Sequence, residues 1–260
     1  MKLTLLGTGD SAGVPQIGCS CRTCARYHDE GRERTRFSLL LENEGERLLV
    51  DASPDLRHQF LREGIDSVDH VLLTHAHYDH YAGLGSLYRV IWEDLPIHGV
   101  SSVLESVVEE RYHYLPFTEP REVEPFERFE VAGMTLRLVR VHHPPAECYG
   151  VVVESGGSKI AVTCDTSRDV PPESVDAMRD ADLLVADSFL PADSDVVYPE
   201  FVADRISDDG MSFADKHMTR EGALDLADEL DVDDVVLVHL SHYFREDGPP
   251  LGDDGDIYEL

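Results

Sequence analysis

The chain has 260 residues, enough to bury a sizeable core in one large domain or two small ones. Asp and Glu number 52 against 22 Lys and Arg, which gives a formal net charge of −30 spread along the whole chain. Such a charge disfavours a polyanionic partner at low ionic strength and suggests a protein adapted to high salt. No apolar run approaches the roughly 20 residues that cross a membrane, and the first apolar run lacks a cleavage site, so we expect a cytoplasmic protein.

The N-terminal segment predicts a strand followed by two loops of unusual composition. Residues 3–7 form the strand, and residues 7–15 form a loop punctuated by glycine. Such a loop can bring backbone amides close to an anion, although a plain turn explains it equally well. Cys19, Cys21 and Cys24 follow within six residues. They are poorly placed to form disulfides with one another and could hold a metal ion, with one tetrahedral position left for another ligand.

The next segment predicts a hairpin and a helix. Residues 37–41 and 47–51 read as two strands joined by a turn at 43–46, and Asp51 ends the second of them. Residues 54–63 read as an amphipathic helix that stops at Gly64.

The most distinctive stretch of the chain reads THAHYDH and spans residues 74–80. It follows the apolar run 71–73, which predicts a short buried strand, and it precedes what reads as the start of a helix. Polar ligands are thus placed at the C-terminal end of a strand, where open α/β folds bind their ligands. In an extended chain His75, His77 and Asp79 would share one side, and a turn is needed to bring His80 to them. Neutral imidazole and carboxylate together suit zinc, manganese or iron, so we expect a metal site here.

Two helices, at 84–92 and 101–111, are expected to cover a sheet. Two strands between residues 126 and 141 then turn at 132–133 and lead into His142 and His143. Successive strand residues point to opposite faces, so only one of these histidines can reach a site at the strand end. A further hairpin, 149–153 with 159–163, leads into Asp165.

The C-terminal third predicts a helix at 171–179, a buried strand at 183–187 and a polar, acidic stretch at 191–213. His217 precedes a helix at 220–230, and a last buried strand at 235–238 runs into His239 and His242. The tail from residue 248 is expected to be loosely ordered. Strand-rich halves, each closed by helices with no linker between them, predict one α/β sandwich domain over residues 1–260.

These motifs resemble those of the metallo-β-lactamase fold superfamily, whose signature His-x-His-x-Asp-His stands complete at residues 75–80. The resemblance implies an αββα sandwich in which two internal β-sheets are flanked by helices. It also implies that Asp51 braces the metal loop, although capping the following turn would explain this residue nearly as well.

The resemblance further implies a dinuclear metal centre in which Asp165 is shared between two ions. The first ion would take His75, His77 and His143, and the second would take Asp79, His80 and His239. His143 fits the family register better than His142, which stays open as the alternative. Zinc and manganese both accept this set, so the sequence does not choose between them. A hydroxide bridging the two ions would attack a phosphoester.

A narrower resemblance is to the cyclic phosphodiesterases of the carbon–phosphorus lyase pathway, which open 5-phosphoribosyl 1,2-cyclic phosphate. It is carried by the Gly-Thr-Gly loop, Cys-x-Cys-x-x-Cys, the histidine signature and His-x-Ser-His at 239–242. His242 would complete the three cysteines into a Cys₃His site for a structural zinc that ties the first loop to the last strand. The place of His217 implies a general acid or a phosphate contact, and we count it with Asp79 as catalytic.

Three other functions are compatible with parts of the sequence. A transfer-RNA 3′-end endonuclease of the same superfamily would need an inserted basic arm, but only 21 residues lie between His143 and Asp165. The quinone-cofactor biosynthesis branch shares the cysteine loop but tends to have a degraded metal motif, which is intact here. A non-catalytic metal-binding protein is the least favoured, because all seven ligands and His217 are present. We therefore expect a phosphodiesterase for a small cyclic diester, without nucleic-acid or membrane partners; a homodimer is compatible with the sequence.

Overall fold

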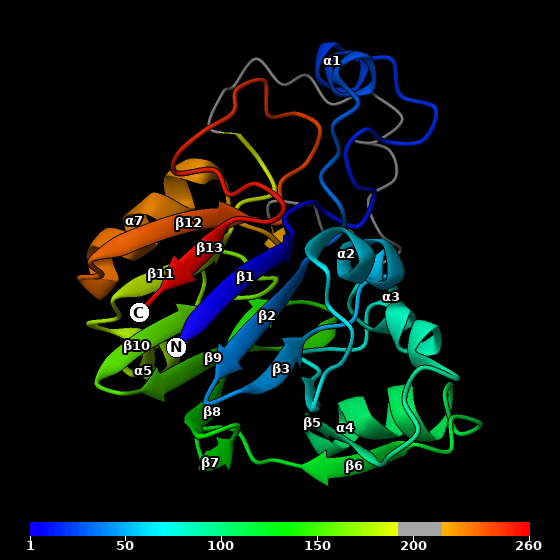
Figure 1. Cartoon of the computed structure of the whole chain (residues 1–260). Coiled ribbons are helices and arrows are strands. Elements are labelled where there is room, and N and C mark those ends of the chain that lie inside the picture. The colour runs from blue at the N-terminus through cyan, green and yellow to red at the C-terminus, as the bar shows by residue number, and fades with distance from the viewer. Residues whose placement is uncertain (192–214) are drawn as a thin grey trace.

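The computed structural model describes residues 1–191 and 215–260, which form two stacked β-sheets with helices against both outer faces (Figure 1). This αββα sandwich is the architecture that the sequence predicts. The polar stretch predicted at 191–213 lies outside the described residues except for Pro191.

The first sheet has seven strands in the order β13-β1-β2-β3-β4-β5-β6. Strands β3 to β6 run parallel to one another, whereas β1, β2, β3 and β13 pair antiparallel. Its members are β1 (Lys2–Gly7), β2 (Ser38–Asn43), β3 (Glu46–Val50), β4 (His70–Leu72), β5 (Leu95–Gly99), β6 (Thr118–Glu122) and β13 (Ile257–Glu259).

The second sheet has six strands in the order β12-β11-β10-β9-β8-β7. Strands β7 to β10 form an antiparallel meander, and β10, β11 and β12 run parallel. Its members are β7 (Arg128–Val131), β8 (Met134–His143), β9 (Ala146–Ser155), β10 (Ser158–Val162), β11 (Leu183–Asp187) and β12 (Asp234–Val238).

The predicted hairpins are confirmed, and each turns on two residues with positive φ. The turns are at 44–45, 132–133 and 156–157, with φ values between 52° and 94°. Two-residue hairpin loops with both residues in this region match the right-handed twist of the strands they join. Glycine stands at the second position of all three turns, where it adopts this backbone conformation at little cost.

Apolar side chains fill two layers. Leucines and valines of both sheets interdigitate in the larger core, where Leu5, Leu41 and Val153 are completely buried. The smaller core lies between the second sheet and the helices that cover it, and contains Met178 and Leu226. The described helices are α1 (Arg22–Glu30), α2 (Leu56–Glu63), α3 (Tyr78–Tyr81), the 3₁₀ helix η1 (Ala82–Leu87), α4 (Ser101–Leu104), the π-helical η2 (Glu105–Glu109), α5 (Pro172–Met178) and α7 (Arg220–Leu230).

Within the described ranges, no helix combines the length and the apolar character needed to span a membrane.

The helix predicted at 84–92 is wrong in its second half. The 3₁₀ helix η1 ends at Leu87, and Arg89 adopts a φ of 65°, which interrupts any helix. Leu84 and Leu87 are buried as a helical pattern requires, but Val90 and Trp92 are 54% and 82% exposed. The apolar spacing therefore misled because Val90 and Trp92, in its second half, face solvent.

The C-terminal tail is ordered, contrary to the expectation from its acidic, glycine-rich composition. Strand β13 pairs with β1, and the Asp254 carboxylate accepts hydrogen bonds from the backbone N–H and hydroxyl of both Thr8 and Thr35, at 2.6–2.9 Å. These contacts join residues more than 200 positions apart, and no local pattern signals them.

We expect Asp254→Ala to lower the free energy of unfolding by roughly 2–4 kcal/mol, because four donors lose an acceptor in a site where the carboxylate is largely buried. Exposed Asp233→Ala is the matched control and should change stability by less than about 0.5 kcal/mol. Guanidinium unfolding of metal-loaded protein measures both. Equal stability of the two variants would show that the tail is not held in this way.

Candidate metal centre

The predicted ligands converge at the C-terminal ends of strands from both sheets. His75, His77, Asp79 and His80 follow β4, His143 ends β8, Asp165 lies just beyond β10, and His239 follows β12. Parallel strands deliver their C-terminal ends to one edge of a sheet, and here two such edges face each other. The structure thus brings together all seven residues that the sequence nominates.

A single helical turn supplies the bend that the histidine signature needs. Helix α3 begins at Tyr78 with His77 as its N-cap, and the backbone N–H of His80 donates to the carbonyl of His77 at 3.0 Å. His75 and His77 therefore lie before the turn, while Asp79 and His80 lie within it.

Three residues at the strand ends around this centre adopt left-handed backbone conformations. Asp51, Cys164 and His239 have φ values of 58°, 50° and 58°. Such conformations are costly for residues other than glycine and persist where surrounding structure requires them, often at functional sites.

The distances within the centre suit a shared metal site. Asp165 Oδ2 lies 3.4 Å from His80 Nε2, 3.5 Å from His239 Nε2, 3.7 Å from His75 Nε2 and 3.8 Å from His143 Nε2. Two donors bound to one tetrahedral ion at about 2.0 Å lie roughly 3.3 Å apart. The Nε2 atoms of His75, His80 and His239 are buried without a hydrogen-bond partner in the described part of the chain. Buried polar atoms are normally satisfied, so these lone pairs fit a cation.

The ligand atoms form two groups that share Asp165. One consists of His75, His77, His143 and Asp165, and the other of Asp79, His80, Asp165 and His239. Within each group the donor atoms lie within 4.8 Å of one another, and this division is the one the sequence predicts. Clusters of this kind are typical of dinuclear metal sites.

The second ring nitrogens of these histidines hold the rings in place. His80 Nδ1 donates to Asp51 Oδ2 at 2.7 Å, and His143 Nδ1 donates to the carbonyl of Lys216 at 2.9 Å. Asp51 also accepts the backbone N–H and the hydroxyl of Thr74, at 2.9 and 2.7 Å. These bonds fix the tautomers that aim Nε2 at the centre. The prediction that Asp51 braces the metal loop is confirmed.

The electrostatics of the centre favour positive charge. Burial alone would lower the pKa of His239, but the Asp165 and Asp79 carboxylates outweigh it and raise that pKa to about 9. The pKa of His80 is likewise raised well above its ordinary value by carboxylates, against burial. For His143, in the other ligand group, the effect of burial exceeds that of the Asp165 carboxylate and lowers the pKa to about 4. The imidazole therefore stays in its neutral, ligating form.

The choice between His142 and His143 follows from strand alternation. His143 faces the centre, with its Nε2 3.1 Å from His77 Nδ1. His142 points away from it, and its Nδ1 lies 2.8 Å from the hydroxyl of Ser167.

His217 lies at the edge of the centre and forms a pair with Asp187, which the sequence analysis did not nominate. His217 Nδ1 donates to Asp187 Oδ2 at 2.8 Å, and its ring stacks on that of His239 with centroids 4.8 Å apart. Asp187 follows the buried run 183–186, just as Asp51 follows an apolar strand. A carboxylate at the end of a buried strand was therefore the missed signal.

The glycine-punctuated loop borders the centre, and two of its backbone amides donate hydrogen bonds to a carboxylate of the same loop. The N–H of Asp10 donates to the carbonyl of Leu240, next to His239, at 3.2 Å. The amides of Ala12 and Gly13 both donate to the Asp10 carboxylate at 3.0 Å, so they are not directed at a bound anion. Burial raises the pKa of Asp10 to about 6.

The three cysteines and His242 also come together. His242 Nδ1 lies 3.2, 3.4 and 3.6 Å from the sulfurs of Cys19, Cys21 and Cys24. Sulfur and nitrogen donors on one tetrahedral zinc lie roughly 3.5 Å apart, so this cluster could bind a structural metal. Cys21 is also the N-cap of α1, whose backbone fixes two of the three sulfurs.

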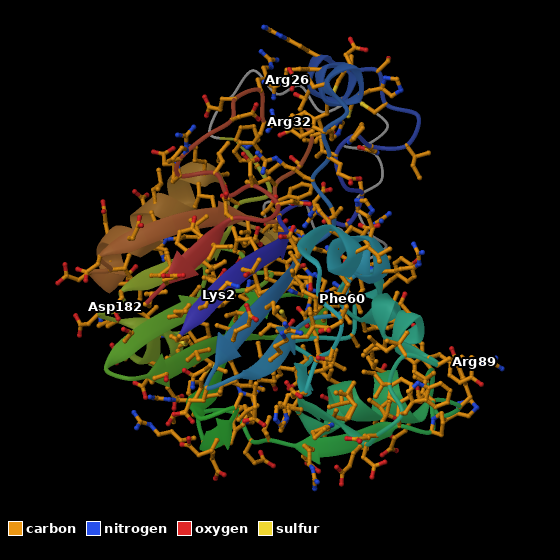
Figure 2. All side chains as sticks on the ribbon, in the orientation of Figure 1. Lys2, Arg26, Arg32, Phe60, Arg89 and Asp182 are labelled. Atoms are coloured by element: carbon orange, nitrogen blue, oxygen red, sulfur yellow. The ribbon has the colours of Figure 1, made fainter. Side chains whose placement is uncertain are left out.

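A polar network fastens α1 to the C-terminal segment independently of any ion. Asp247 accepts hydrogen bonds from Arg26, Tyr27 and Arg32 at 2.9–3.0 Å. Figure 2 labels Arg26, which belongs to α1, and Arg32, which lies just after its C-terminal end.

A family model described as the beta-lactamase superfamily domain matches residues 46–240, from β3 to the residue after His239. The chain belongs to the metallo-β-lactamase superfamily. Both ligand groups lie within or at the border of the matched segment, whereas the cysteines precede it.

Two solved structures share the whole fold with this chain. A diphosphatase from the PhnP family has a TM-score of 0.82 and 26% identity, with 100% of this chain and 97% of that one covered. Zn²⁺-bound PqqB from Methylobacterium extorquens has a TM-score of 0.83 and 22% identity, with 100% of both chains covered, and this second likeness shows the fold alone.

A curated relative from Porphyromonas gingivalis, named octanoyltransferase, is 34% identical over 257 residues. The match covers 94% of this chain but 46% of that protein, and the chain spans less than half the length of the curated relatives that match first. That name therefore belongs to a much longer protein.

We expect purified protein to contain about three metal ions per chain, two in the His/Asp groups and one in the cysteine cluster. Cys24→Ser should reduce the content to about two, because it removes one of four ligands. Cys148→Ala, a buried cysteine outside the cluster, is the control and should keep all three. Inductively coupled plasma mass spectrometry measures the content, and equal content in both variants would contradict the assignment.

Proposed function

We propose that the protein is a metal-dependent phosphodiesterase that hydrolyses a small cyclic phosphodiester, such as 5-phosphoribosyl 1,2-cyclic phosphate. The observation that supports this most is the pair of His/Asp groups joined through Asp165, with orphaned imidazole nitrogens aimed at their centre.

The two His/Asp groups would each hold one divalent ion, zinc or manganese, and would share Asp165. Such ions lower the pKa of a water molecule and neutralise the charge of a phosphodiester. The chain itself orients the ligands through Asp51, Thr74 and the Lys216 carbonyl. It also buries most of the site, where electrostatic interactions are stronger than in water.

In this proposal His217 moves a proton. Its Nδ1–H is held by Asp187, which leaves Nε2 free to carry a proton to the leaving oxygen of the ester. The carboxylate of Asp187 orients the ring, as a carboxylate does for the histidine of a catalytic triad.

Hydrolysis of a diphosphate is the second candidate, because the solved relative named a diphosphatase is alike over the whole chain. An RNA substrate has less support. The segment between His143 and Asp165 consists of the β9–β10 hairpin without an inserted arm, and the net charge is −30. Comparing a cyclic ribose phosphate, a nucleoside diphosphate and precursor tRNA as substrates separates these possibilities.

We expect metal-loaded protein to hydrolyse bis(p-nitrophenyl) phosphate and His77→Ala to lower kcat/KM by about 100-fold or more, because the variant loses a ligand of one ion. His58→Ala, which replaces an exposed histidine far from the ligand groups in sequence, is the matched control. Release of p-nitrophenol measures the rate. Turnover by wild type that does not exceed that of His77→Ala would refute the enzymatic proposal.

We expect His217→Ala to lower kcat by about 10²- to 10⁴-fold at unchanged metal content. A general acid matters less when the leaving group is a stable anion, so the loss should be smaller for a p-nitrophenyl ester than for an alkyl ester. Asp187→Asn should show the same trend with a smaller loss. Steady-state kinetics on both esters measures this, and an equal loss on both would assign His217 to binding.

A further inference from the structure

Asp187 lies beside both His217 and the predicted metal ligand His239. Strands β11 and β12 run parallel, and Asp187 pairs with Val238, the residue before His239. Asp187 Oδ2 accepts the Nδ1–H of His217 at 2.8 Å, and Asp187 Oδ1 lies 3.8 Å from His239 Nδ1. The two imidazoles therefore face different oxygens of one carboxylate.

Backbone hydrogen bonds hold this carboxylate in place. Asp187 is 1% exposed, its Oδ2 also accepts the backbone N–H of Thr166 at 2.9 Å, and its Oδ1 accepts that of Phe189 at 3.1 Å. Thr166 directly follows the shared ligand Asp165, so one of these bonds joins the carboxylate to the segment that carries this ligand. Because each oxygen has a backbone donor of its own, the carboxylate presents one oxygen to each histidine.

The Nδ1 atom of His239 still needs an acceptor. It is buried without a hydrogen-bond partner in the described part of the chain, whereas the Nδ1 atoms of His80 and His143 bond to Asp51 and to the Lys216 carbonyl. An imidazole that binds a cation through Nε2 carries its remaining proton on Nδ1, and such an N–H is normally given an acceptor. The gap of 3.8 Å exceeds an ordinary hydrogen bond by about 1 Å, so a shift of that size in the His239 ring would complete the bond.

We propose that Asp187 is a positioning residue for both histidines. One oxygen orients His217 for proton transfer, and the other accepts the Nδ1–H of His239 when that ring holds an ion through Nε2. The part that concerns His217 rests on the proposed function, whereas the part that concerns metal binding does not. The two rings also stack, with centroids 4.8 Å apart and an interplanar angle of 14°. Binding of the ion at His239 and the orientation of His217 therefore depend on the same side chain.

The substitution Asp187→Asn separates this role from packing. Asparagine has nearly the same shape, but it presents one oxygen and one NH₂ group, and an NH₂ group cannot accept a hydrogen bond from an imidazole N–H. It can therefore serve only one of the two histidines. His217→Ala, by contrast, leaves the carboxylate to His239 and should not weaken metal binding.

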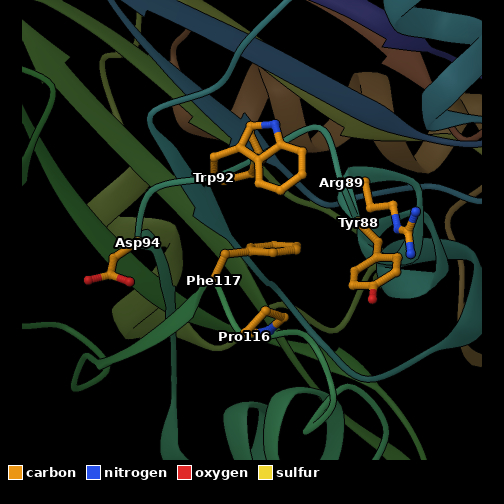
Figure 3. Close-up of a pocket in the computed structure, with 7 residues that line it drawn as sticks. Tyr88, Arg89, Trp92, Asp94, Pro116 and Phe117 are labelled. Atoms are coloured by element: carbon orange, nitrogen blue, oxygen red, sulfur yellow. The ribbon is translucent and has the colours of Figure 1, made fainter.

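An exposed carboxylate elsewhere provides the matched control. Asp94 lines a pocket of about 430 Å³ together with Tyr88, Trp92 and Phe117 (Figure 3). The lining contains none of the predicted ligands, and Asp94 precedes the N-terminal end of β5, at the sheet edge opposite to the ligands. Asp94→Asn is the same chemical change outside the metal centre.

The test measures zinc affinity by competition with a chelator. In Asp187→Asn the affinity for one of the two ions of the metal centre should fall about 10- to 100-fold, as when the outer partner of a ligating histidine is removed. His217→Ala and Asp94→Asn should bind zinc as wild type does. Anomalous diffraction from crystals of Asp187→Asn at limiting zinc should show a weakened peak at His239, with the peaks at His77 and at the cysteine cluster retained.

Wild-type zinc affinity in Asp187→Asn would overturn the inference and leave the phosphodiesterase function standing. If wild type hydrolyses no ester, the proposed function fails, and the affinities alone decide on the role of Asp187 toward His239. Loss of zinc from the cysteine cluster as well would mark a misfolded variant, and the structure of zinc-loaded wild type then decides. In it the distance from His239 Nδ1 to Asp187 Oδ1 should be below about 3.2 Å. A distance that stays near 3.8 Å, or an ion bound to Asp187 itself, would overturn the inference.

Discussion

The site depends on three aspartates, Asp51, Asp79 and Asp165, that are buried among imidazoles with little access to water. Buried carboxylates need compensating positive charge. The carboxylates around His80 and His239 accordingly raise the pKa of both histidines above its ordinary value, although burial alone would lower it. A pair of divalent ions meets the same demand through the lone pairs that the structure leaves unsatisfied. The site therefore favours cations because the two sheets bury these carboxylates and imidazoles together at the ends of their strands.

Long-range contacts hold these strand ends in register. Asp51, just after β3, joins Thr74 and His80, which follow β4, and the Lys216 carbonyl holds His143 at the end of β8. Behind them, Asp254 fastens the tail to the first loop, and the cysteine cluster joins that loop to the residues after β12. Each link connects residues distant in sequence, so the geometry of the site depends on tertiary contacts.

Much of the fold could be predicted from the sequence because its patterns are local. The hairpins follow from alternation interrupted by a glycine at each turn, and the ligands follow from polar residues at the ends of apolar runs. The errors and omissions are of tertiary origin. The tail at 248–260 is ordered by partners in the first strands, Val90 and Trp92 face solvent, and Asp187 acquires a role only because His217 reaches it.

The central claim is that these side chains hold a pair of metal ions. Anomalous diffraction from crystals of protein loaded with manganese or zinc tests it directly. The account predicts two peaks about 3.5–4 Å apart, flanking Asp165, with His75, His77 and His143 on one and Asp79, His80 and His239 on the other. An absence of peaks at these ligands, or a single peak with one group of side chains turned away, would contradict it.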